Sequence, residues 1–106
     1  MFPRALTISE SSSVLLLGPR GTGKSTLLRE HFGPRASLWV DLLDPELEHR
    51  YSLRPAELRD QIEALPTPGW VVIDEIQKVP SLLDVVHAAI EGRGRGDRRV
   101  RFAMTG

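Results

Sequence analysis

Residues 13–32 read SVLLLGPRGTGKSTLLREHF, and this stretch decides the fold. It begins with an apolar run over residues 13–17, which is typical of a strand buried on both faces of a sheet. Glycine then recurs through residues 18–23, and residues 24–32 predict a helix that ends at Gly33 and Pro34. A buried strand, a glycine-rich loop and a helix in direct succession indicate one β-α unit of a parallel sheet.

The glycine-rich loop fits the pattern G-x-x-x-x-G-K-[ST] without a mismatch. Its glycines allow backbone angles that point successive N–H groups at one oxyanion, and the dipole of the following helix adds positive potential there. The loop also holds one of only two lysines in the chain, against twelve arginines, which favours a site for a compact ammonium. We therefore expect ATP to be bound by Gly18, Pro19, Arg20, Gly21, Thr22, Gly23, Lys24, Ser25 and Thr26.

A second motif, WVVIDE at residues 70–75, places two carboxylates at the end of an apolar strand. An acidic residue in this position can hold Mg²⁺, so we expect Asp74 and the hydroxyl of Ser25 to be its protein ligands. Glu75 is the expected base that activates the attacking water, and Lys24 would contact the β- and γ-phosphates. The plainer interpretation of Glu75 is a surface charge at the end of a strand.

The rest of the chain alternates strands with helices. Strands are predicted at residues 37–43, 69–73 and 100–104, and helices at 55–65 and 81–91. Asp44 and Pro45 predict a turn, and residues 46–54 receive no assigned structure. This alternation predicts an α/β fold, a three-layer α/β/α sandwich with a parallel sheet and its ligands at the carboxyl ends of the strands.

Composition excludes several classes of function. The 14 cationic and 14 anionic side chains cancel, so no overall field indicates a membrane or nucleic acid as partner. The arginine-rich loop at residues 92–99 has no aromatic residue for base stacking and is interpreted as a solvated turn. The chain has no cysteine and no apolar stretch resembling a signal or a membrane span, which favours a cytoplasmic location.

Four segments together resemble a group of prokaryotic AAA-type P-loop ATPases: GPRGTGKSTLLRE, VDLLDPELEHRY, VVIDEIQKVPSLLDVVH and RFAMTG. The resemblance runs from about Ser13 to Gly106. It implies the AAA strand order, in which the strand at residues 100–104 lies between the P-loop strand and the Asp74 strand. It also implies that Thr105 is a polar sensor that touches the γ-phosphate or the attacking water.

Members of that group continue through a fifth strand, a helical lid and a C-terminal domain. The resemblance therefore predicts that residues 1–106 form a single P-loop ATPase domain that is incomplete, truncated after the fourth strand. The P-loop strand would then lack its outer neighbour, and such an unpaired edge favours self-association. We expect slow ATP hydrolysis at best, and a C-terminal domain or a protein partner outside this sequence.

Three functions remain open at this point. The leading one is an ATPase domain that uses Mg²⁺. The second is a module that binds ATP without hydrolysing it, and the third, less favoured, is a phosphotransferase. A GTPase of the Ras type is disfavoured because such proteins read guanine with an asparagine-containing motif, and this chain has no asparagine.

Overall fold

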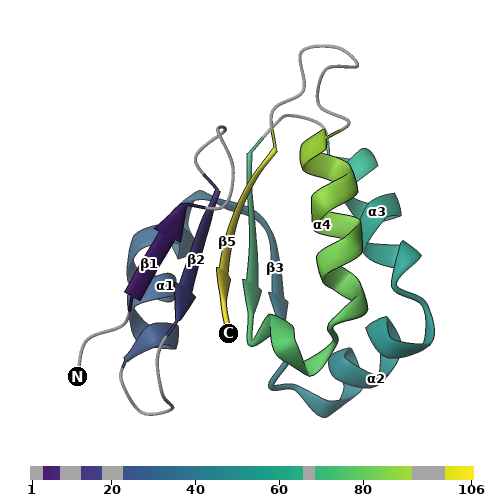
Figure 1. The fold of residues 1–106 in the computed structure, drawn as a ribbon, viewed down its shortest axis with the longest axis horizontal. Helices are drawn as coiled ribbons and strands as arrows, with labels where there is room; N and C mark the ends of the chain where they lie inside the picture. Colours follow the sequence, from purple (N-terminus) through teal and green to yellow (C-terminus); the bar gives the residue numbers. More distant parts are fainter. Residues whose placement is uncertain (1–3, 8–12, 18–22, 66–68, 92–99) are drawn as a thin grey trace.

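The computed structural model of the chain describes residues 4–7, 13–17, 23–65, 69–91 and 100–106. From β2 onward, one or two helices separate each strand from the next (Figure 1). The strands are β1 (Arg4–Thr7), β2 (Val14–Leu17), β3 (Ala36–Asp41), β4 (Trp70–Asp74) and β5 (Arg101–Thr105). The α-helices are α1 (Lys24–Phe32), α2 (Pro45–Leu53), α3 (Ala56–Glu63) and α4 (Ser81–Glu91), and short 3-10 helices occur at η1 (Gly33–Arg35) and η2 (Ile76–Lys78).

One five-stranded sheet forms the centre of the fold, in the order β1-β2-β5-β4-β3. The pairs β2·β5, β5·β4 and β4·β3 are parallel, so the carboxyl ends of these four strands lie at the same edge. Strand β5 lies between β2 and β4, which confirms the AAA strand order that the sequence resemblance implied. Strand β5 is therefore a central strand of the sheet.

The prediction that β2 lacks an outer neighbour is wrong. Strand β1 pairs with β2 in the antiparallel direction, with Arg4 opposite Leu17 and Thr7 opposite Val14. Sequence reasoning missed β1 because four residues are too few to show a periodic pattern. The edges of the sheet are consequently β1 and β3. Because β2 is paired on both sides, it has no open edge that would favour self-association.

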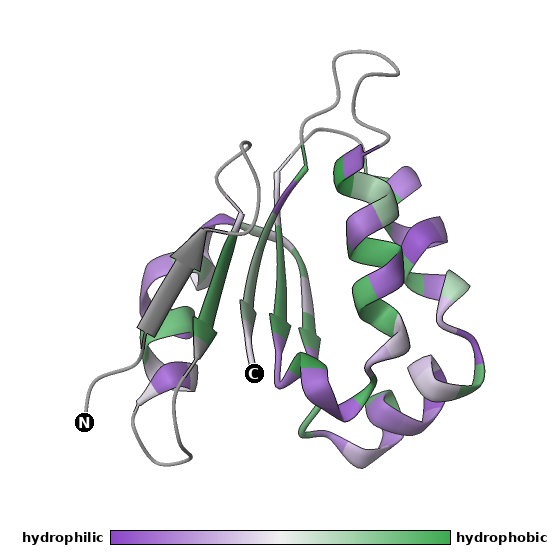
Figure 2. Cartoon of the chain, viewed as in Figure 1, coloured by the Kyte–Doolittle hydropathy of each residue, from purple (hydrophilic) through white to green (hydrophobic). Residues whose placement is uncertain are grey.

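Alternating side chains of the central strands fill two separate cores. On β4, Val72 packs with Leu28 of α1, whereas Val71 and Ile73 pack with the side chains of α3 and α4. Helix α1 therefore covers one face of the sheet, and α3 and α4 cover the other (Figure 1). Figure 2 shows these central strands coloured as hydrophobic over most of their length. The predicted three-layer α/β/α sandwich is confirmed.

Helix α2 occupies the segment to which the sequence assigned no structure, and its start was misread as a turn. Asp44 caps the helix, because its side chain accepts a hydrogen bond from the backbone N–H of Glu46, and Pro45 takes the first helical position. Tyr51 is the buried residue of α2, and its hydroxyl donates to Oε1 of Gln61 on α3 over 2.6 Å. Burial raises the pKa of this tyrosine.

Strand β5 is fixed at both ends by hydrogen bonds to the β2 side of the sheet. The backbone N–H of Phe102 donates to Oγ of buried Ser13 over 2.9 Å. The N–H of Gly106 donates to the carbonyl of Leu16 over 3.1 Å. These bonds place Thr105 and Gly106 at the carboxyl edge of the sheet. None of the helices in the described part of the chain is both long and apolar enough to cross a membrane.

Two leucines provide a test of the packing. Leu58 is fully buried in the core beneath α3, whereas Leu53 at the end of α2 is 73 % exposed. We expect Leu58→Ala to lower the free energy of unfolding by about 2–5 kcal/mol, because it leaves a cavity in the core. The control Leu53→Ala should change it by less than about 0.5 kcal/mol. Urea denaturation of both variants measures the difference, and equal losses would contradict this description of the core.

Candidate functional site

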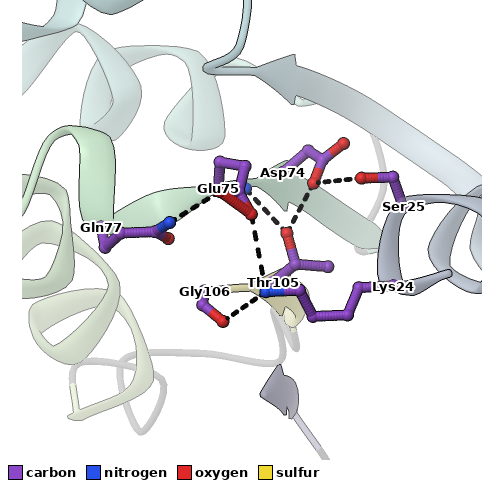
Figure 3. A network of polar contacts seen from close by, with 7 residues as sticks. All are labelled: Lys24, Ser25, Asp74, Glu75, Gln77, Thr105 and Gly106. Carbon is purple, nitrogen blue, oxygen red and sulfur yellow. Dashed lines mark hydrogen bonds and ion pairs between the residues drawn. The ribbon is translucent and has the colours of Figure 1, made fainter. Parts of the chain in front are cut away.

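Polar side chains from three parts of the chain meet at the carboxyl edge of the sheet. The end of β4 contributes Asp74 and Glu75, the end of β5 contributes Thr105, and the first turn of α1 contributes Lys24 and Ser25 (Figure 3). All but Ser25 are buried. The strand order brings them together, because β5 lies beside β4 and ends near Lys24 at the start of α1.

The start of α1 depends on a left-handed glycine. Gly23 has φ 84° and ψ 14°, and its carbonyl accepts the first backbone hydrogen bond of the helix, from Leu27. Glycine adopts this conformation without the steric cost that a side chain brings. Lys24 is then the first helical residue, and Thr26 lies exposed on the first turn. Residues 18–22 lie outside the described residues, so the parts predicted for Gly18, Pro19, Arg20, Gly21 and Thr22 remain predictions.

Asp74 is 1 % exposed, and one of its carboxylate oxygens accepts hydrogen bonds from two hydroxyl groups. Oγ of Ser25 donates to Oδ1 of Asp74 over 3.1 Å, and Oγ1 of Thr105 donates to the same atom over 2.5 Å. The expected magnesium pair, Ser25 and Asp74, is therefore in direct contact. Both offer the oxygen ligands that Mg²⁺ prefers, and Mg²⁺ normally keeps several waters in addition to one or two protein ligands.

Few acidic side chains lie close to Asp74 in the described part of the chain. Among the described residues, no group of three or more histidines, aspartates or glutamates is arranged to hold a metal ion alone. Asp41 pairs in register with Asp74 on the neighbouring strand, but its Oδ1 accepts from the N–H of Leu43 over 3.0 Å. Asp41 therefore stabilises the turn after β3.

Lys24 is buried, with 7 % of its surface exposed, and faces two acceptors. Its Nζ donates to the carbonyl oxygen of Gly106 over 2.8 Å and lies 3.7 Å from Oε2 of Glu75. Lys24, Asp74 and Glu75 are thus three buried ionisable groups with formally one positive and two negative charges. Lys24 therefore compensates part of the negative charge that the described buried residues place at this edge of the sheet.

Glu75 has an unusual backbone. Its φ of 63° lies in the left-handed region, and it is the one described residue other than glycine with a positive φ. For such a residue this conformation costs roughly 1–3 kcal/mol and commonly occurs at functional sites. Oγ1 of Thr105 accepts the N–H of Glu75 over 2.8 Å, and the carbonyl of Glu75 accepts from Lys78 as η2 begins. The backbone is therefore held on both sides.

Two participants were missed by sequence reasoning, Gln77 and the carbonyl of Gly106. Nε2 of Gln77 donates to Oε1 of Glu75 over 2.6 Å, from the turn η2 (Figure 3). Gln77 was visible as part of the distinctive segment DEIQKVP, but no rule of spacing singled it out. A main-chain carbonyl carries no residue-type signal, so the acceptor at Gly106 could be found only from the structure.

The double role of the Thr105 hydroxyl can be tested without any ligand. Thr105→Val keeps the shape of the side chain but removes the acceptor for the N–H of Glu75 and the donor to Asp74. We expect a loss of about 1–3 kcal/mol in the free energy of unfolding, because buried polar groups lose their partners. Amide hydrogen exchange at Glu75 should become faster, whereas Thr105→Ser, which keeps the hydroxyl, should retain the protection. Unchanged exchange at Glu75 in Thr105→Val would contradict the geometry.

A comparison with models of protein families matches residues 10–106 to a family described as an AAA domain. No solved structure matches the chain. The family match spans most of the sequence and includes the glycine-rich loop, both acidic residues and Thr105. It agrees with the observed strand order, in which β5 lies between β2 and β4. The chain therefore belongs to the AAA domain family, a family of nucleotide-binding ATPase domains.

Proposed function

We propose that this chain binds ATP together with Mg²⁺ and hydrolyses it to ADP and phosphate. The observation that carries the proposal is the convergence of Lys24, Ser25, Asp74 and Glu75 at the start of α1, in one network of hydrogen bonds and an ion pair. These side chains supply a cation for phosphate, two oxygen ligands for magnesium and a carboxylate that can accept a proton. Membership of a nucleotide-binding family supports the same assignment.

Phosphate binding would use Lys24 and the N–H groups at the start of α1. The Lys24 ammonium now donates to the main-chain oxygen of Gly106. A β- or γ-phosphate oxygen carries negative charge and would form a charge-assisted hydrogen bond with the same ammonium. The helix terminus adds favourable potential for an anion. Binding would therefore exchange the Gly106 carbonyl for a phosphate oxygen.

Magnesium would be held through Ser25 and Asp74. Their oxygens already lie within hydrogen-bond distance, and the formal excess of negative charge among the buried groups favours a cation there. When bound, Mg²⁺ neutralises charge on the phosphates and orients them. The chain itself would hold Asp74 in place, through the hydrogen bond from the Thr105 hydroxyl and the buried end of β4.

Hydrolysis would depend on Glu75 as the base. Its carboxylate would accept a proton from a water molecule whose oxygen attacks the γ-phosphorus. The bond between that phosphorus and the bridging oxygen to the β-phosphate breaks, and ADP leaves. The hydroxyl of Thr105 donates a hydrogen bond to Asp74 and accepts one from the N–H of Glu75. Thr105 would therefore act by orienting these two residues. The direct contact of Thr105 with the γ-phosphate remains a prediction.

The two alternative functions use the same site in different ways. A module that binds ATP without turnover would need Lys24, Ser25 and Asp74 but not Glu75. A phosphotransferase would pass the phosphoryl group to a second substrate instead of water. The buried Glu75 carboxylate could accept the proton of water or of a substrate hydroxyl, so the fate of the labelled γ-phosphate distinguishes an ATPase from a phosphotransferase. In the ATPase, hydrolysis would drive movement of an attached domain or a protein partner.

The two lysines of the chain provide a matched test of ATP binding. Lys24→Ala should weaken magnesium-dependent ATP binding at least tenfold, because about 1.4 kcal/mol corresponds to a factor of ten and a lost charge-assisted bond exceeds that. Lys78→Ala, which removes an exposed ammonium from η2, should leave the Kd unchanged. Titration with a fluorescent ATP analogue measures both. Equal affinities for Lys24→Ala and the wild-type chain would contradict the proposed phosphate site.

Glu75→Gln separates hydrolysis from binding. It keeps the size of the side chain but cannot accept the proton, so the single-turnover rate should fall by about 10²–10⁴-fold while the Kd for ATP stays within about threefold. Glu91→Gln, an exposed residue at the end of α4, is the matched control. Single-turnover assays with γ-labelled ATP suit a slow enzyme. A variant that hydrolyses as fast as the wild-type chain would contradict the role of Glu75 as the base, and a wild-type chain that binds ATP without turnover would favour the non-hydrolysing alternative.

A further inference from the structure

We propose that Gln77 is a positioning residue for Glu75, and that it sets the orientation of the carboxylate that accepts the proton. The inference deepens the proposed function and rests on it. It starts from one contact, the hydrogen bond of 2.6 Å from Nε2 of Gln77 to Oε1 of Glu75. Gln77 lies on the side of Glu75 opposite to Asp74 and Ser25 (Figure 3), and its effect on the reaction would pass through Glu75.

The Glu75 carboxylate is held from two sides by groups of different kinds. Gln77 binds Oε1 from η2, and the Lys24 ammonium lies 3.7 Å from Oε2 on the side of α1. The lysine would turn to the phosphates when ATP binds. Of these two contacts, only the one with Gln77 would then remain to fix the carboxylate. Gln77 therefore matters most in the nucleotide-bound state, when the orientation of Glu75 determines the rate.

The amide of Gln77 has one chemically sensible orientation. A carboxylate can only accept, so the NH₂ group of Gln77 must face Glu75 and its carbonyl must face away. On that other side the chain approaches closely at Gly106. A Cβ atom added to Gly106 by substitution would lie 3.3 Å from Oε1 of Gln77 and 3.6 Å from Cγ2 of Ile76. The carbonyl of Gln77 thus lies near Gly106, the residue that follows β5.

The backbone explains why a partner two residues away reaches the carboxylate. Glu75 is left-handed, and η2 follows immediately, so the chain turns sharply after β4. The turn brings the side chain of Gln77 back toward Glu75. A Glu side chain has three rotatable bonds, and holding its end in place removes rotamer freedom that would otherwise have to be lost in the transition state. A fixed carboxylate therefore lowers the activation barrier without changing how tightly ATP binds.

Gln77 is exposed, which makes the inference testable with a folded protein. Gln77→Ala removes the amide, and Gln77→Glu replaces it with a carboxylate of the same size that repels Glu75. The matched control is Gln61→Ala on α3, which removes the other glutamine of the chain, the partner of Tyr51, away from the site. Urea denaturation should give Gln77→Ala a midpoint close to that of the wild-type chain, because exposed substitutions have small effects.

The decisive readout is the split between turnover and binding in single-turnover assays. We expect Gln77→Ala to lower the single-turnover rate about tenfold. This loss is smaller than the contribution of a whole general base, which is about 10²–10⁴-fold. The Kd for Mg-ATP should stay within about twofold of the wild-type value. Gln77→Glu should lower the rate further, and Gln61→Ala should leave it unchanged. In a Glu75→Gln background, Gln77→Ala should cause no additional loss, because its effect acts through the carboxylate.

Three outcomes would overturn the inference, and they can be told apart from failure of the proposed function. A Gln77→Ala rate equal to wild type, while Glu75→Gln is inactive, would show that water replaces the amide without loss and would leave the ATPase proposal intact. A parallel loss of rate and ATP affinity would assign Gln77 to binding instead. A wild-type chain with no magnesium-dependent hydrolysis would overturn the proposed function and this inference with it.

Discussion

The hydroxyl of Thr105 joins the two acidic residues on which the site depends. It donates to Oδ1 of Asp74 and accepts the N–H of Glu75, and it is completely buried. Both bonds require β5 to lie directly beside β4, as it does in the strand order β1-β2-β5-β4-β3. The buried hydroxyl network is fully paired at this point, which gives it a single geometry. The parallel sheet, the left-handed Glu75 and the start of α1 are therefore parts of one arrangement.

Much of the fold could be predicted from the sequence, because strong periodic segments lie between clear breaks. Helices α1 and α4 have the predicted bounds, since glycine and proline mark the end of the first and Gly92 follows the second. Helix α2 was missed because its apolar positions are few, although Asp44 and Pro45 form a recognisable start. Strand β1 was missed because a strand of four residues is defined by its pairing partner rather than by its own pattern.

The site shows the same division. Motif spacing predicted Lys24, Ser25, Asp74 and Glu75, and the structure brings these four together, whereas the contribution of Thr105 followed from family resemblance and strand order. The contacts of Gln77 and of the Gly106 carbonyl depend on backbone direction after β4 and β5, which no residue pattern encodes. In this arrangement Lys24 is satisfied by groups of the chain itself. The proposed binding of ATP would therefore be an exchange of partners, in which phosphate competes with a carbonyl and a carboxylate for one ammonium.

A crystal structure of the chain with Mg²⁺ and a non-hydrolysable ATP analogue would test whether Lys24, Ser25 and Asp74 form the site for ATP and magnesium. If they do, Nζ of Lys24 leaves the main-chain oxygen of Gly106 for the β- and γ-phosphate oxygens, and Ser25 leaves Asp74 for the metal. Gln77 stays hydrogen-bonded to Glu75. A nucleotide bound elsewhere, with Lys24 still hydrogen-bonded to Gly106, would contradict this assignment.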